Sequence, residues 1–88
     1  MYFATTALTP LGKWQVIVNA ANESDAKVDA RAAASAVSSC HLGQITLKDL
    51  RRTVRKSINE NFHAAKYCTT NGQPWAWINY NHAANGGW

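Results

Sequence analysis

Cysteine and histidine are the side chains of this sequence that could bind a metal or act in catalysis. Cys40, His41, His63 and Cys68 are all metal-ligand types, but their spacing matches no standard zinc motif. Cys68 with His63 would supply a nucleophile and a base, yet no orienting acid lies nearby in the sequence. No glycine-rich phosphate loop is present. We therefore expect no metal, no cofactor and no enzymatic activity.

Positive charge is concentrated in residues 46–63, and this concentration indicates a binding surface. The chain has a formal net charge of +4. If this segment is helical, its cations and hydrogen-bonding side chains share one flank. The predicted flank consists of Lys48, Arg52, Arg55, Lys56, Asn59 and His63. Such a flank would suit an acidic protein surface or a run of phosphates, and an ordinary solvated helix face is the alternative.

Trp75 and Trp77 are one residue apart, so they point to the same face of a strand. An exposed tryptophan pair can stack on nucleic-acid bases or anchor a protein interface. Bulky aliphatic residues are few in this chain, however, and tryptophans are also core material. The sequence leaves both interpretations open.

Residues 2–19 are predicted to form a β-hairpin. The sequence TPLG (residues 9–12) has Pro and Gly where a type I turn prefers them. With Leu8 opposite Lys13, the apolar side chains alternate with polar ones, as in a sheet with one buried side. The predicted buried face consists of Phe3, Thr5, Ala7, Trp14, Val16 and Val18, and the polar face includes Tyr2, Thr6, Lys13, Gln15 and Asn19.

Two helices are predicted after this hairpin. Asn22 or Ser24 caps the first, which ends at HLG (residues 41–43). Its stripe of small residues is Ala26, Ala30, Ala33, Val37 and Cys40. The second helix is predicted over residues 47–63, after a variant of the capping box in TLKD (residues 46–49). Its apolar stripe is Leu47, Leu50, Val54, Ile58, Phe62 and Ala65. A short strand at residues 44–46 is an alternative.

A second hairpin is predicted around Asn71–Gly72, because this dipeptide favours a type I′ turn. In that register Cys68 lies opposite Trp75, and Lys66 lies opposite Trp77. Residues 81–88 are predicted to be a flexible tail.

The predicted fold is a single α+β domain over residues 1–80, in the order β-β-α-α-β-β. Both helices would cover one face of an antiparallel sheet whose strand order is not determined. The predicted core consists of Trp14, Val16, Val18, Val37, Leu47, Leu50, Val54, Ile58 and Phe62.

The predicted function is binding rather than catalysis. The sequence has no signal peptide and no run of roughly 18 apolar residues, so we expect a cytoplasmic protein with reduced thiols and no membrane partner. We expect a protein partner, held by the aromatic hairpin and the basic helix, as in a bacterial or phage accessory or inhibitor protein. The alternatives are nucleic-acid binding through the same basic residues and self-association as a homodimer.

Overall fold

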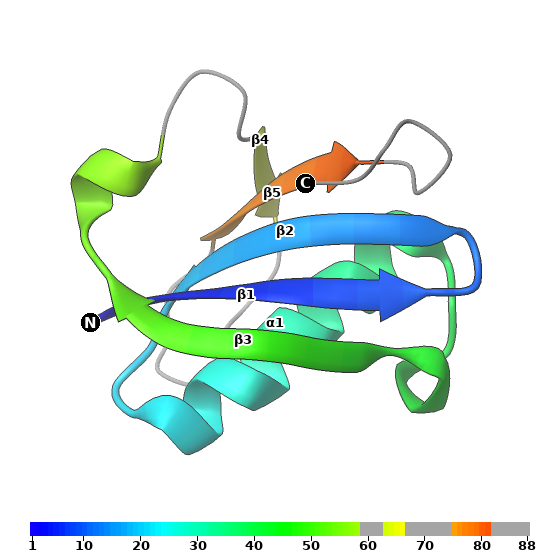
Figure 1. Ribbon diagram of the computed structural model, residues 1–88, viewed down its shortest axis with the longest axis horizontal. Helices are drawn as coiled ribbons and strands as arrows, with labels where there is room; N and C mark the ends of the chain where they lie inside the picture. The colour runs from blue at the N-terminus through cyan, green and yellow to red at the C-terminus, as the bar shows by residue number, and fades with distance from the viewer. Residues whose placement is uncertain (59–62, 67–74, 82–88) are drawn as a thin grey trace.

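The computed structural model describes residues 1–58, 63–66 and 75–81, which form an antiparallel sheet and an α-helix packed on one of its faces (Figure 1). The strands are β1 (Tyr2–Thr9), β2 (Gly12–Asn19), β3 (Thr46–Thr53), β4 (His63–Lys66) and β5 (Trp75–Asn81). They are ordered β3-β1-β2-β5-β4. The helix α1 (Glu23–Ser38) lies behind the sheet in Figure 1. The prediction of a two-layer α+β fold is therefore confirmed, although a strand takes the place of the second helix.

The hairpin of β1 and β2 forms as predicted. Its register pairs Leu8 with Lys13, and its turn contains Pro10 and Leu11. The six side chains of the predicted apolar face are all buried. Alternation of apolar and polar residues thus correctly identified which side of this hairpin faces the core.

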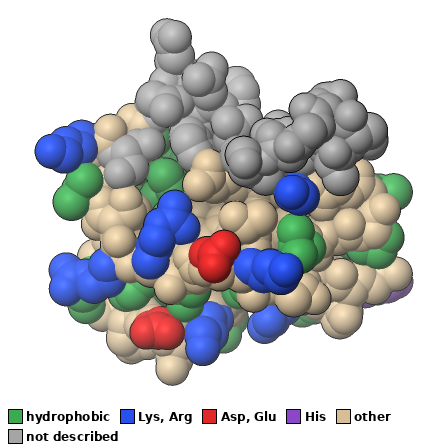
Figure 2. Space-filling view, in the orientation of Figure 1, with side chains coloured by type: hydrophobic (Ala, Val, Ile, Leu, Met, Phe, Trp, Pro, Cys, Tyr) green, Lys and Arg blue, Asp and Glu red, His purple; other side chains and the backbone are tan. Residues whose placement is uncertain are grey.

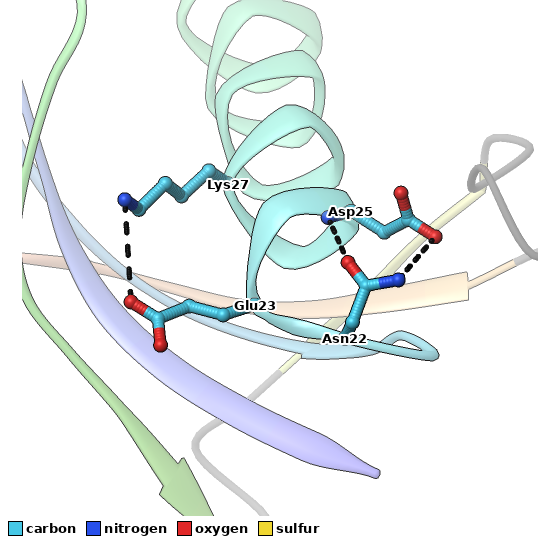
Figure 3. A network of polar contacts seen from close by, with 4 residues as sticks. All are labelled: Asn22, Glu23, Asp25 and Lys27. Carbon is cyan, nitrogen blue, oxygen red and sulfur yellow. Dashed lines mark hydrogen bonds and ion pairs between the residues drawn. The ribbon is translucent and has the colours of Figure 1, made fainter.

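The start of α1 is fixed by Asn22, one of the two predicted caps (Figure 3). Asn22 Oδ1 accepts a hydrogen bond from the Asp25 backbone N–H at 2.9 Å, which satisfies one of the free donors of the first turn. In the same turn, the Lys27 ammonium lies 4.0 Å from the Glu23 carboxylate. Both side chains are exposed, so this ion pair contributes little to stability.

Small side chains allow α1 to lie close to the sheet. Ala26, Ala30, Ala33 and Ala34 have no exposed surface. The predicted stripe fails at its end, because Val37 is 40% exposed while Ser38 is buried in its place. Ser39 then adopts the left-handed conformation that ends many helices, with φ of 60°. Cys40 is buried but lies beyond the helix, which ends before the predicted HLG.

The predicted second helix is wrong. Residues 46–53 form β3, and residues Arg55–Ser57 form a short 3₁₀ turn, η2. Another 3₁₀ turn, η1, spans Leu42–Gln44. The alternative strand at residues 44–46 is therefore wrong for its first two residues, and only Thr46 belongs to a strand, as the first residue of β3. The capping box of TLKD consequently does not exist.

The apolar residues of this segment are less buried than predicted. Leu47 and Leu50 pack against the core from β3, and Ile58 is half-buried. Val54, however, is 51% exposed. Phe62 lies outside the described residues. The largest part of the core comes instead from β1, β2 and α1, with Ile45 and Ile78.

The strands β4 and β5 pair in a register two residues away from the predicted one. Lys66 lies opposite Trp75, and Ala64 lies opposite Trp77. A shift of two residues leaves the alternation of faces unchanged. The predicted turn at Asn71–Gly72, Cys68 and the tail residues 82–88 lie outside the described residues. No helix in the described part of the chain has the length and apolarity needed to cross a membrane.

Candidate functional site

The face of the sheet turned away from α1 is here called the outer face. It carries cationic, hydrogen-bonding and aromatic side chains that could contact a ligand. Its residues follow from the strand registers, because residues directly opposite each other share a face. They are Tyr2, Ala4, Thr6, Leu8, Lys13, Gln15, Ile17, Asn19, Thr46, Lys48, Arg51, Thr53 and Trp77. Figures 1 and 2 view the molecule from this side.

An aromatic platform on the outer face is formed by one residue each from β1, β5 and η2. The rings of Tyr2 and Trp77 are 5.9 Å apart between centroids and tilted by 55°. The Arg55 guanidinium lies 5.8 Å from the centre of the Trp77 ring, within the range of a cation–π contact. Arg55 Nη1 also donates to Tyr2 Oη at 3.5 Å. We call Tyr2, Arg55 and Trp77 the aromatic platform.

The platform stands over an apolar patch of the same face. Ile17 lies opposite Trp77, and Ala4 lies two residues along β1 from Tyr2. Both are almost fully buried, with 2% and 3% of their surface exposed. Trp77 itself stays half-buried. Trp77 is therefore neither a fully buried core residue nor a fully exposed one.

Cations are concentrated in the sheet layer rather than in the helix layer. The strands β2 and β3 with η2 carry six Lys or Arg residues against one Asp: Lys13, Lys48, Arg51, Arg52, Arg55 and Lys56 against Asp49. In contrast, α1 carries Lys27 and Arg31 against Glu23, Asp25 and Asp29. Figure 2 shows Lys and Arg side chains spread over the outer face, with Asp and Glu sparse among them. The sheet side therefore carries the positive charge that attracts an anion.

A β-bulge in β3 decides which of its cations face outward. In the pairing of β1 with β3, Thr6 lies opposite Lys48 and Ala4 lies opposite Arg51. The two residues Asp49 and Leu50 therefore lie opposite the single residue Thr5. Lys48 and Arg51 consequently share the outer face although they are three residues apart. Arg52, opposite Phe3, lies on the α1 side of the sheet, where it is exposed.

The bulge is held by two hydrogen bonds. Thr5 Oγ1 donates to the Lys48 carbonyl oxygen at 2.8 Å, and Thr5 is fully buried. Arg51 Nη1 donates to the Asp49 carbonyl oxygen at 3.0 Å. Asp49 has a φ of 58°, in the left-handed region. The extra residue is thus fixed in one arrangement.

The structure brings together only some of the predicted site residues. Arg55 contacts Trp77, and Lys48 lies on the same face. Arg52 lies on the opposite face, and Lys56 is exposed in η2. The backbones of His63 and Trp75 lie in β4 and β5, whereas Asn59 lies outside the described residues.

Tyr2, Lys13 and Arg51 belong to the surface but were not predicted as site residues. A signal for the first two was present, because Tyr2 and Lys13 lie on the polar face of the predicted hairpin. Arg51 reaches the outer face only because of the bulge in β3. Residues 46–53 contain no glycine that would have indicated a bulge in the sequence.

The candidate metal ligands are not grouped among the residues that the structure describes. Cys40 is buried, and its thiol donates to the Ser38 carbonyl oxygen at 3.7 Å, whereas the adjacent His41 is exposed. Within residues 1–58, 63–66 and 75–81, no three His, Cys, Asp or Glu side chains come together as a metal site would require. Cys68 lies outside the described residues.

Comparisons of this chain with protein-family models, with curated proteins and with solved structures found no match.

Proposed function

We propose that this chain is a non-enzymatic binding protein that holds single-stranded nucleic acid on the outer face of its sheet. The observation that carries the proposal is the aromatic platform standing within the cationic face. Proteins that bind single strands combine cations that follow the phosphates with aromatic rings on which bases stack. Tyr2, Arg55 and Trp77 would supply the stacking surface, and Lys13, Lys48 and Arg51 would contact phosphates.

A single strand fits this surface better than a duplex does. Bases in a duplex are stacked on one another and cannot lie on a protein ring without being extruded. Unpaired bases can stack on aromatic rings and on Arg guanidinium planes, and both groups are present in the platform. The outer face runs along β1 from Tyr2 to Leu8, which at about 3.3 Å per residue spans roughly 20 Å.

An acidic protein partner is the second candidate, and the position of β3 favours it. Among the described strands, β3 is at one edge of the sheet and carries Lys48, Arg51 and Arg52. An acidic strand could pair with such an edge. The bulge at residues 49–50 interrupts that edge, however, and bulges and charges are the devices that discourage strand addition. Self-association through β3 would bring like charges together, so it ranks third.

Arg51 and Arg52 provide a matched pair for the test, because they are adjacent in β3 and lie on opposite faces. Fluorescence anisotropy would measure the binding of a labelled thymidine oligomer of roughly ten nucleotides. We expect Arg51→Ala to weaken binding about fourfold, the counterion-release contribution of one single-strand phosphate at physiological salt. Arg52→Ala should change the affinity less than about twofold, because its charge lies on the α1 side.

Two results would contradict the proposal. The first is the absence of oligonucleotide binding by the unmodified chain at low salt. The second is an equal loss of affinity in the two variants, since that would mean that net charge alone matters. Light scattering on the same samples would show whether the chain forms a dimer. Capture of an acidic peptide in place of the oligonucleotide would favour the second candidate.

A further inference from the structure

A hollow of about 280 Å³ opens on the outer face, at the end of the sheet where β1 finishes and β2 begins. The described residues that line it are Thr6, Leu8, Lys13, Lys48 and Asp49. Its volume is near the lower end of small-ligand sites, which are roughly 300–1,000 Å³. A single base or a phosphate group is therefore the size of ligand that it fits. We call it the basic hollow.

The carboxylate of Asp49 makes the basic hollow unsuitable for a phosphate alone. Lys13 and Lys48 would attract a phosphate, but Asp49 would repel it. An ionised carboxylate only accepts hydrogen bonds, so it requires a ligand that donates them. The lining thus fits a ligand with an anionic group, a hydrogen-bond donor and an apolar surface that Leu8 can contact. A nucleotide has all three.

The backbone at Asp49 indicates that its side chain has a role. Asp49 is the first of the two bulge residues and has a φ of 58°. A bulge whose first residue is left-handed usually has glycine there, because a Cβ atom makes this conformation less favourable. Thr5 and Arg51 nevertheless fix the bulge on either side of Asp49. The backbone of Asp49 is thus fixed at the wall of the hollow with a positive φ, and such backbone conformations are often found at functional sites.

On the basis of the proposed function, we infer that the basic hollow reads a guanine base in the bound strand. Guanine presents two adjacent donors, N1–H and the N2 amino group, and a carboxylate can accept from both at once. Thymine presents a single N–H on the same edge. Lys13 and Lys48 would hold the adjoining phosphates, and Leu8 would pack against the base. Asp49 is thereby a specificity-determining residue rather than a general binding residue.

The test compares two oligonucleotides of roughly ten nucleotides. One contains only thymidine, and the other has a single guanine at its centre. We expect the unmodified chain to bind the guanine-containing strand at least about fivefold more tightly, the discrimination typical of one good bidentate contact. Asp49→Asn and Asp49→Gly should both lose this preference, while their affinity for thymidine should be equal to or higher than that of the unmodified chain, because a charge that repels phosphate is removed. Glu23→Gln, which removes an equal charge from α1, should leave the preference unchanged.

Thermal melting of Asp49→Gly separates recognition from folding. Because glycine adopts positive φ freely, we expect its melting temperature to equal or exceed that of the unmodified chain. Asp49→Asn, which also tolerates this conformation, provides the same comparison with the shape of the side chain retained.

The possible outcomes distinguish failure of the proposed function from failure of the inference about guanine. If the unmodified chain binds neither strand, the proposed function fails and the reading of guanine fails with it. If it binds both strands equally, the proposed function stands and the inference about the basic hollow is overturned. A guanine preference that persists in Asp49→Gly would likewise overturn the role of Asp49.

Discussion

Trp77 is the residue on which the stacking part of the account depends. It contacts Tyr2 on one side and the Arg55 guanidinium on another, and it lies opposite the buried Ile17. The sequence identified Trp77 as a site residue while leaving open whether it was core or displayed. Its half-buried state lies between the two, since Trp77 is neither fully buried nor fully exposed.

Trp77→Leu should separate these two roles. Leucine retains apolar cover over Ile17 but offers no flat ring, so the stacking energy of one base, about 1–3 kcal/mol, is lost. We expect binding of a thymidine oligomer to weaken at least about fivefold in an anisotropy titration. Trp77→Phe, which preserves a ring, should lose less. Unchanged affinity in the leucine variant would show that Trp77 does not stack on the ligand.

At the scale of elements, the bulge in β3 explains why a helix was predicted over residues 47–63. It brings Leu47 and Leu50 to the same side, three residues apart, and that spacing is typical of a helix. It does the same for Lys48 and Arg51 on the outer face. A regular strand would have shown a period of two. The β1–β2 hairpin has no such interruption, and its register and buried face were predicted correctly.

The start of α1 was predictable for a local reason. Asn22 caps the helix within its own turn, so the signal depends on residues only three apart. In contrast, the bulge depends on Thr5 and Lys48, which are 43 residues apart. No local pattern reports such a contact. The sequence therefore identified Lys48 and Arg55 as surface cations, but it did not identify Arg51 or reveal that Arg52 lies on the opposite face.

Thr5→Val tests whether this long-range hydrogen bond holds the bulge. The change preserves shape but removes the hydroxyl that donates to the Lys48 carbonyl oxygen. We expect a loss of about 0.5–1.5 kcal/mol in the free energy of unfolding, measured with urea. Thr46→Val, the same change at an exposed position of β3, should stay within about 0.5 kcal/mol. Equal stability of the two variants would mean that the bulge is maintained by the surrounding packing alone.

At the scale of the whole molecule, charge is separated between the two layers. The sheet side carries the excess of Lys and Arg, and α1 carries more carboxylates than cations. The net charge of +4 therefore understates the positive potential that a ligand meets at the outer face. This arrangement should orient a polyanion toward the aromatic platform before contact is made.

The salt dependence of binding tests this account most directly. The logarithm of the association constant for a thymidine oligomer should fall linearly with the logarithm of salt concentration. Lys48→Ala combined with Arg51→Ala should reduce the magnitude of the slope by about 1.4, since each single-strand phosphate contact contributes about 0.7. Lys27→Ala combined with Arg52→Ala removes one Lys and one Arg from the α1 side and should leave the slope unchanged. Equal slopes in the two double variants, or no slope in the unmodified chain, would contradict a nucleic-acid surface on the outer face.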